Sequence, residues 1–185
     1  MLQPVQITEY FIENMLNPGD IVVDATAGNG NDTLKLCNAV GNTGLVYAFD
    51  IQKQALINTE TKLKEYGFSN FKLIEASHSE LDTYVTSPVK AVLFNLGYLP
   101  GGDHNVHTSP DTTIPAIEKS LQILSPDGFV SVCIYYGKNS GTFEKEIVVD
   151  FLKTIDSKKY TVLLCDFLNR PNCPPLTAII VRNSR

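Results

Sequence analysis

The sequence predicts an α/β fold with a doubly wound, mostly parallel seven-stranded sheet and a C-terminal antiparallel hairpin. Short apolar runs alternate with segments of helical periodicity, which is typical of strands joined by crossover helices. A glycine-rich turn follows the first apolar run, as in nucleotide-binding α/β folds. The last two runs are separated by a connection too short for a crossover helix, so they pair antiparallel.

Each strand is predicted from a short apolar run, and four of the runs are followed directly by Asp or Asn. The predicted strands cover residues 21–23, 45–49, 71–74, 91–94, 129–135, 160–168 and 178–181. Apolar side chains at helical spacing predict the helices between them. The predicted helices cover residues 5–16, 33–40, 51–66, 80–84, 112–124 and 142–154. A turn is expected at residues 125–128, where Ser-Pro-Asp-Gly separates a helix from a strand.

Length and charge limit the classes of protein that this chain can represent. Its 185 residues are most simply one domain, residues 1–185, with a well-buried core. A net charge of −5 disfavours a large nonspecific nucleic-acid surface, which needs clustered cations. A local basic patch remains compatible with that charge. Its candidates are Lys138, Lys145, Arg170 and Arg182.

The cysteines and the absence of targeting segments point to a cytoplasmic protein. The 4 cysteines are scattered, without a C-x-x-C pair, so neither a disulfide framework nor a zinc site is expected. We expect no bound metal. The N-terminus lacks a secretory signal pattern, and no apolar run is long enough to span a bilayer. The sequence is compatible with a homodimer but has no apolar stripe that demands one.

The turn after the first strand carries a carboxylate, Asp24, ahead of two glycines, Gly28 and Gly30. Glycine has no Cβ, so the backbone can approach a ligand closely. The third position of the G-x-G-x-x-G pattern is Thr33, so the dinucleotide fingerprint is incomplete. An ordinary strand-to-helix turn, with Asp32 or Thr33 as the N-cap, is the structural alternative.

Asp24 favours a cationic cofactor over a dinucleotide. A pyrophosphate on a helix N-terminus is negatively charged and would be repelled by a carboxylate at the same strand end. S-adenosylmethionine has no phosphate and carries a sulfonium and an ammonium group, which Asp24 could attract. The sequence therefore predicts a methyl-donor site rather than an NAD site.

Polar residues end successive apolar runs, and the topology brings strand ends to one edge of the sheet. These residues are Asp24, Asp50, Ser77, His78 and Asn95. Asp50 has the spacing of a carboxylate that accepts both ribose hydroxyls, although it could also cap the next helix. Gln52 could contact the same nucleoside. Ser77 and His78 lie where a loop could meet the adenine edge, and a lone histidine could equally have no ligand role.

The segment Asn95-Leu96-Gly97-Tyr98 is a partial match to the Asn/Asp-Pro-Pro-Tyr tetrad of amino-methyltransferases. In that tetrad the Asn oxygen accepts a hydrogen bond from the target amine and the aromatic ring packs on the substrate. Such contacts align the nitrogen with the methyl group. Both prolines are absent here, and a glycine-rich loop without a substrate is the alternative. Asp103, His104 and His107 follow in the same loop and could accept the amine proton.

These motifs resemble the class I S-adenosylmethionine-dependent methyltransferases, and more closely the small family labelled rRNA methylases. The matching segments are DATAGNGNDT at 24–33, FDIQ at 49–52, SH at 77–78, NLGYLPGGD at 95–103 and NCPPL at 172–176. The resemblance covers nearly the whole chain and is most specific at 95–103. It implies a Rossmann-like methyltransferase domain.

The resemblance also implies a substrate and residue roles. Family members of this kind methylate the 5-aminomethyl group of 2-thiouridine at the wobble position of tRNA. Donor contacts are implied at Asn29, Asn31, Asp50, Gln52, Ser77 and His78, and substrate-side roles within 95–103. Alternatives are an rRNA or small-molecule amine acceptor, a non-catalytic donor-binding module, and an NAD-dependent oxidoreductase. We expect Asn95, Tyr98 and Asp103 to act on the acceptor.

Overall fold

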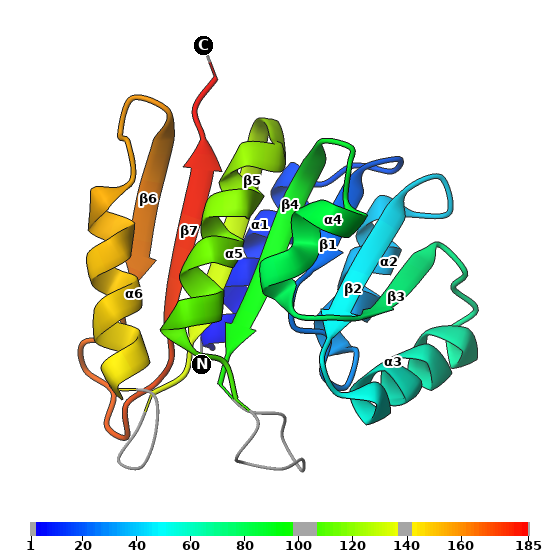
Figure 1. Ribbon diagram of the computed structural model, residues 1–185, viewed down its shortest axis with the longest axis horizontal. Coiled ribbons are helices and arrows are strands. Elements are labelled where there is room, and N and C mark those ends of the chain that lie inside the picture. Colours follow the sequence, from blue (N-terminus) through cyan, green and yellow to red (C-terminus); the bar gives the residue numbers. More distant parts are fainter. Residues whose placement is uncertain (1–2, 98–106, 137–141, 185) are drawn as a thin grey trace.

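A computed structural model describes residues 3–97, 107–136 and 142–184. The described residues form one seven-stranded sheet in the order β3-β2-β1-β4-β5-β7-β6 (Figure 1). The strands are β1 (Ile21–Asp24), β2 (Leu45–Asp50), β3 (Phe71–Glu75), β4 (Val89–Leu96), β5 (Leu124–Ile134), β6 (Tyr160–Cys165) and β7 (Leu176–Arg182). Strands β1 to β5 are parallel, whereas β7 is antiparallel to both β5 and β6. The predicted fold class is confirmed.

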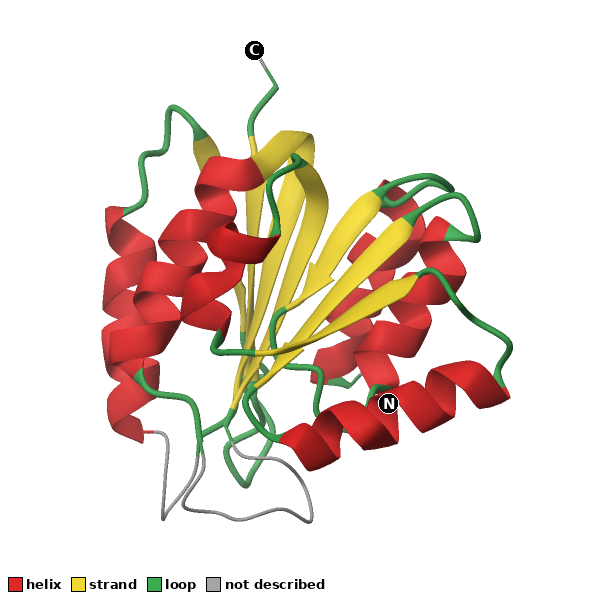
Figure 2. Ribbon diagram, turned by 45° about the vertical axis from the view of Figure 1, so that its right-hand side comes forward, coloured by secondary structure: helices red, strands yellow, loops and turns green. Residues whose placement is uncertain are grey.

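Helices cover both faces of the sheet, as Figure 2 shows. The helical elements are α1 (Pro4–Met15), α2 (Asn31–Val40), α3 (Lys53–Glu65), the 3₁₀ turn η1 (His78–Glu80), α4 (Leu81–Tyr84), α5 (Pro110–Ile123) and α6 (Thr142–Thr154). Helices α1 to α3 pack on one face, and α4 to α6 on the other. Adjacent strand residues therefore enter different cores: Val22 packs with the α1 and α2 side chains, and Val23 with those of α5 and α6.

Most element boundaries differ from the predicted ones by a few residues, and three of the differences concern the site or the sheet pairing. The helix expected from residue 51 begins at Lys53, because the Gln52 N–H donates to the Asp50 carboxylate and Gln52 is extended. The strand expected to reach residue 168 ends at Cys165, and a turn follows in which the Arg170 N–H donates to Phe167 O. The residues of the turn expected at 125–128 fall within the bounds of β5, at an irregularity where the pairing with β4 shifts register.

The sheet register sets the position of the functional edge. Asp24 lies beside Leu93, Asp50 beside Glu75, and Asn95 beside Cys133. The carboxyl ends of β1 to β4 therefore meet at one edge, at the bottom of Figure 1. Because β7 is antiparallel, its first residues and the β6–β7 connection reach that same edge. None of the helices in the described ranges is long and apolar enough to cross a membrane.

Candidate active site

A cavity of about 240 Å³ opens at the carboxyl ends of β1 to β4. Predicted site residues that line it are Gly28, Asp50, Gln52, Ser77, His78 and Asn95. Residues 107–109 and Thr112 also line the cavity, from the approach to α5 and from its first turn. The structure thus gathers four strand ends around one space, as a ligand at a topological switch point requires.

Asp24 lies behind this cavity and is fully buried. Its Oδ2 accepts a hydrogen bond from the Thr33 hydroxyl at 2.6 Å, and its Oδ1 accepts one from the Thr26 N–H at 3.1 Å. Burial, reinforced by the negative charge of Asp32, raises the pKa of Asp24 to about 7. Asp24 therefore braces the turn, and its attraction for a cationic donor stays a prediction.

The two glycines of the turn have left-handed backbone angles, with φ of 53° at Gly28 and 74° at Gly30. At Gly30 a Cβ would lie 2.9 Å from the Cα of Thr59, because α3 passes directly beside the turn. Gly30 is also the N-cap of α2, so neither Asp32 nor Thr33 caps that helix. The glycine-rich turn is therefore fixed by packing as well as by conformation.

Asn29 and Asn31 face α3 rather than the cavity. Asn29 Oδ1 accepts a hydrogen bond from Asn58 Nδ2 at 3.1 Å, and Asn31 Oδ1 accepts one from Lys62 Nζ at 2.6 Å. Neither asparagine is among the cavity-lining residues. Their implied donor contacts stay predictions, to be made through the backbone or after these side chains rearrange.

Asp50 joins the glycine turn to the start of α3. One carboxylate oxygen accepts the Gly28 N–H at 2.9 Å, and the other accepts the Gln52 N–H at 2.8 Å. A carboxylate oxygen can accept more than one hydrogen bond. Asp50 can therefore hold these two backbone groups and still accept ribose hydroxyls in the cavity that it lines.

Ser77 and His78 form the side of the cavity at the end of β3. Ser77 Oγ accepts the Ser79 N–H at 3.2 Å and caps η1. His78 is buried against Phe94, with the ring centroids 5.8 Å apart. Burial lowers the pKa of His78 to about 4, so the imidazole is neutral at pH 7. Its buried Nε2 has no hydrogen-bond partner among the described residues, which leaves it available to a ligand.

Asn95 lines the cavity, one residue before the end of β4, and is fixed by two contacts. Its N–H donates to Thr26 Oγ1 at 2.7 Å, and its Nδ2 donates to Asp32 Oδ2 at 2.8 Å. Sequence reasoning missed Thr26 and Asp32 as partners of Asn95, since nothing in their spacing links them to a residue more than sixty positions away. Tyr98, Asp103 and His104 lie outside the described residues. His107 lines the cavity and is exposed.

The two described ends of the Asn95-to-Thr108 segment are held together. The Gly97 N–H donates to Thr108 Oγ1 at 2.8 Å, and the Thr108 N–H donates to Gly97 O at 3.0 Å. The Thr108 and Thr113 hydroxyls each donate at 3.0 Å to the buried carboxylate of Glu144, on α6. This carboxylate, also missed by sequence reasoning, ties the acceptor side of the cavity to a distant helix.

Comparison with known proteins identifies the family. The model of the family described as "Putative rRNA methylase" matches residues 46–181. This chain belongs to that family. A relative in Arabidopsis thaliana, the chloroplastic tRNA (mnm(5)s(2)U34)-methyltransferase, is 37% identical to this chain over 183 residues, which cover 93% of this chain and 67% of the relative.

Two solved structures of similar proteins have the same fold. The rRNA methylase from Clostridium thermocellum is 45% identical, with a TM-score of 0.96 over 98% of each chain. A methyltransferase from Streptococcus mutans, solved in complex with SAH, is 40% identical, with a TM-score of 0.90 over 98% of this chain and 99% of that one. These methylases match the described architecture from end to end.

Proposed function

We propose that this methylase transfers a methyl group from S-adenosylmethionine to the 5-aminomethyl group of the tRNA wobble uridine, with or without its 2-thio group. The product is the 5-methylaminomethyl nucleoside. The observation that carries the proposal is the position of Asn95, which lines the cavity next to the last residue of β4 and is fixed by Thr26 and Asp32. The name of the Arabidopsis relative supports the same acceptor.

S-adenosylmethionine is the methyl donor, since the similar Streptococcus mutans methyltransferase holds SAH, the product of such a transfer. In the proposed arrangement Asp50 accepts the ribose hydroxyls, and Gln52 contacts the same nucleoside. Ser77 and the neutral His78 meet the adenine. The Gly28–Gly30 turn passes close to the donor. Asp24 attracts the cationic part of the donor, and Asn29 and Asn31 contact it through the backbone or after their side chains leave Asn58 and Lys62.

The reaction is an in-line displacement at carbon. The amine nitrogen forms a bond to the methyl carbon as the carbon–sulfur bond breaks, so the sulfonium becomes a thioether and the nitrogen gains the positive charge. The alkylated amine then loses a proton. Because the sulfonium is already activated, the protein contributes mainly alignment. Asn95 orients the amine, and we assign Tyr98 to packing on the base and Asp103 to the proton.

Two cation–aromatic pairs at the same edge support a nucleic-acid acceptor. Lys145 Nζ lies 3.9 Å from the ring centroid of Tyr136, and the Arg170 guanidinium lies 4.0 Å from that of Phe167. Tyr136 follows β5, and the segment with Phe167 and Arg170 precedes β7. Both segments leave the sheet at neighbouring positions, since Ile134 pairs with Leu176.

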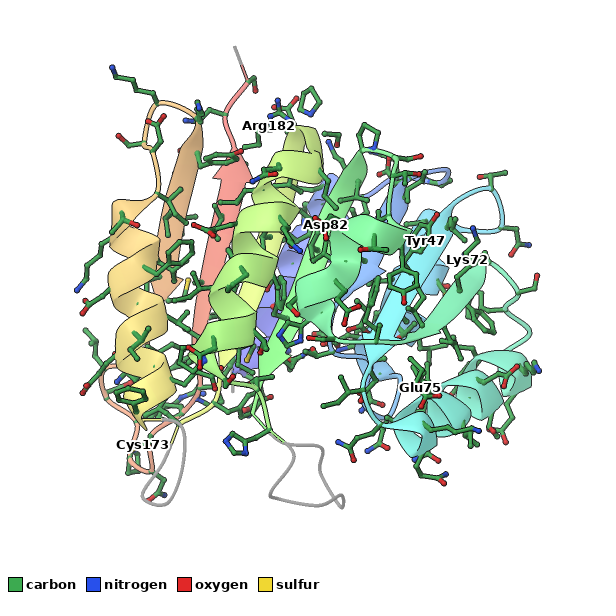
Figure 3. All side chains as sticks on the ribbon, in the orientation of Figure 1. Tyr47, Lys72, Glu75, Asp82, Cys173 and Arg182 are labelled. Atoms are coloured by element: carbon green, nitrogen blue, oxygen red, sulfur yellow. The ribbon has the colours of Figure 1, made fainter. Side chains whose placement is uncertain are left out.

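Figure 3 places Cys173, in the β6–β7 connection, at this lower edge, and Arg182 at the opposite end of the sheet. The basic patch expected from the sequence is therefore limited to Lys145 and Arg170 among the described residues. Aromatic rings and cations together suit stacked bases and phosphates. This combination favours an RNA over a small-molecule amine.

The decisive experiment incubates the protein with S-adenosylmethionine and tRNA carrying the unmethylated aminomethyl group, followed by nucleoside mass spectrometry. We expect the methylaminomethyl nucleoside, and its rate of formation to fall at least tenfold in Asn95→Ala with donor affinity unchanged. Ribosomal RNA is the matched alternative acceptor, because the family is described by that substrate. A methylated rRNA nucleoside with unmodified tRNA would overturn the proposal, and donor binding without either product would favour a binding module.

We infer that one domain, residues 1–185, carries the whole activity in the cytoplasm. A homodimer would widen the RNA-facing surface.

A further inference from the structure

The side-chain amide of Asn95 is in contact with a carboxylate from another element. Asn95 Nδ2 donates to Asp32 Oδ2 at 2.8 Å, across a sequence separation of 63 residues. Asp32 lies in the first turn of α2, directly after the glycine turn. The contact therefore joins the donor half of the site to the residue assigned to the acceptor.

A carboxylate fixes the polarity of an amide that it touches. An ionised carboxylate only accepts hydrogen bonds, so the amide must present its NH₂ group, although the oxygen has nearly the same shape. We propose that Asp32 is a positioning residue that holds the Asn95 amide in the one orientation in which Oδ1 can accept a hydrogen bond from the substrate amine. This proposal rests on the proposed function, because it assumes that Asn95 binds that amine.

Asp32 is itself held on its other oxygen. Lys35 Nζ lies 2.9 Å from Asp32 Oδ1 and 2.9 Å from Glu9 Oε1, so the cation bridges α2 and α1. Burial alone would lower the pKa of Lys35, but its hydrogen bonds and charge contacts with Asp32 and Glu9 outweigh burial and raise it. The paired cation holds the Asp32 carboxylate by its Oδ1, and the other oxygen, Oδ2, accepts the hydrogen bond from the Asn95 amide.

The backbone of Asn95 has its own support. Its N–H donates to Thr26 Oγ1 at 2.7 Å, independently of Asp32. Changing Asp32 should therefore release the amide without displacing the end of β4. This separation of backbone and side-chain support makes the orientation testable.

Three variants test whether Asp32 sets the orientation of the Asn95 side-chain amide. In Asp32→Asn two amides face each other and can pair either way, so Oδ1 of Asn95 is no longer directed to the amine. In Asn95→Asp two carboxylates face each other and repel. The double variant, Asp32→Asn with Asn95→Asp, restores one amide facing one carboxylate and again offers an oxygen acceptor to the amine.

We expect Asp32→Asn to slow methyl transfer at saturating donor and tRNA about tenfold, and Asn95→Asp by more, with the dissociation constant of S-adenosylmethionine and the melting temperature little changed. The double variant should be at least tenfold faster than Asn95→Asp. Asp150→Asn is the matched control, because Asp150 also pairs with a lysine three residues later, Lys153, at 2.8 Å, but on an exposed face. The control should retain full activity.

The outcomes separate this proposal from the one on which it rests. If Asn95→Ala transfers methyl groups at the normal rate, the amine-binding role of Asn95 fails and the role of Asp32 fails with it. If Asn95→Ala is slow while Asp32→Asn equals the Asp150→Asn control, only the positioning role is overturned. A double variant no faster than Asn95→Asp would overturn it as well.

Discussion

Replacing the buried carboxyl of Asp24 by an amide should change how the stability of the protein depends on pH. In Asp24→Asn the amide oxygen can accept the Thr26 N–H and the NH₂ group can donate to the Thr33 hydroxyl. The variant thus imitates the protonated carboxyl: it keeps the hydrogen bond from the Thr26 N–H and reverses the direction of the hydrogen bond with the Thr33 hydroxyl. What it removes is the charge that appears in the buried site at higher pH.

The size of the effect follows from the shifted pKa. Burial raises the pKa of Asp24 from 3.8 to about 7, so the native state keeps a proton that the unfolded chain loses. The stability that this proton provides is fully present below pH 3.8 and is lost as the pH rises through about 7. Integrating the linkage from about pH 5 to about pH 8 gives a loss of about 2.5 kcal/mol for the wild type.

The assay is urea unfolding of wild type and Asp24→Asn at both pH values. Between pH 5 and pH 8 the free energy of unfolding of the wild type should fall by about 2.5 kcal/mol relative to the variant, or roughly 5–10 °C in melting temperature. Other titrating groups cancel in this difference. Parallel pH profiles for the two proteins would show that Asp24 is ionised in the native state and would refute the reasoning.

Three further changes probe the donor and acceptor sides of the site. Asp50→Ala should weaken S-adenosylmethionine binding about 10- to 100-fold by calorimetry, because a charged hydrogen-bond acceptor is lost. Unchanged affinity would show that Asp50 does not bind the ribose hydroxyls. Gly30→Ala should lower the free energy of unfolding by about 1–3 kcal/mol, since its Cβ would lie 2.9 Å from the Thr59 backbone; an unshifted denaturation midpoint would contradict this. Lys145→Glu should raise the KM for tRNA several-fold and leave donor affinity unchanged, whereas the exposed Lys153→Glu should do neither; equal effects of the two would argue against an RNA contact at Lys145.

The sheet could be predicted from the sequence because buried strands consist of continuous runs of apolar residues. Apolar runs such as 21–23 and 91–94 are continuous since parallel central strands are covered on both faces. The same topology then placed Asp50, Ser77, His78 and Asn95 at one edge without any knowledge of side-chain contacts.

The contacts within the site could not be predicted, since they depend on side-chain direction. Asp24 has the position of a ligand-binding carboxylate. Its side chain nevertheless points into the core, where it accepts hydrogen bonds from Thr26 and Thr33. Asn31 sits in the glycine turn but reaches Lys62 on α3. Asp32 and Glu144 gave no signal because their partners come from elements distant in sequence.

The hydrogen bonds between Gly97 and Thr108 affect how easily the segment between them, and with it the choice of acceptor, could change in evolution. Gly97 and Thr108 are hydrogen-bonded to each other, and the Thr108 hydroxyl also donates to Glu144 on α6. The two residues that flank the intervening segment are therefore held close together. Loop-closure entropy rises only slowly with loop length. A segment of different length or composition could therefore be exchanged between Gly97 and Thr108 while Asp50 and His78, which lie on other elements, keep their places. The acceptor side of the cavity could in this way vary without any change to the residues assigned to the donor.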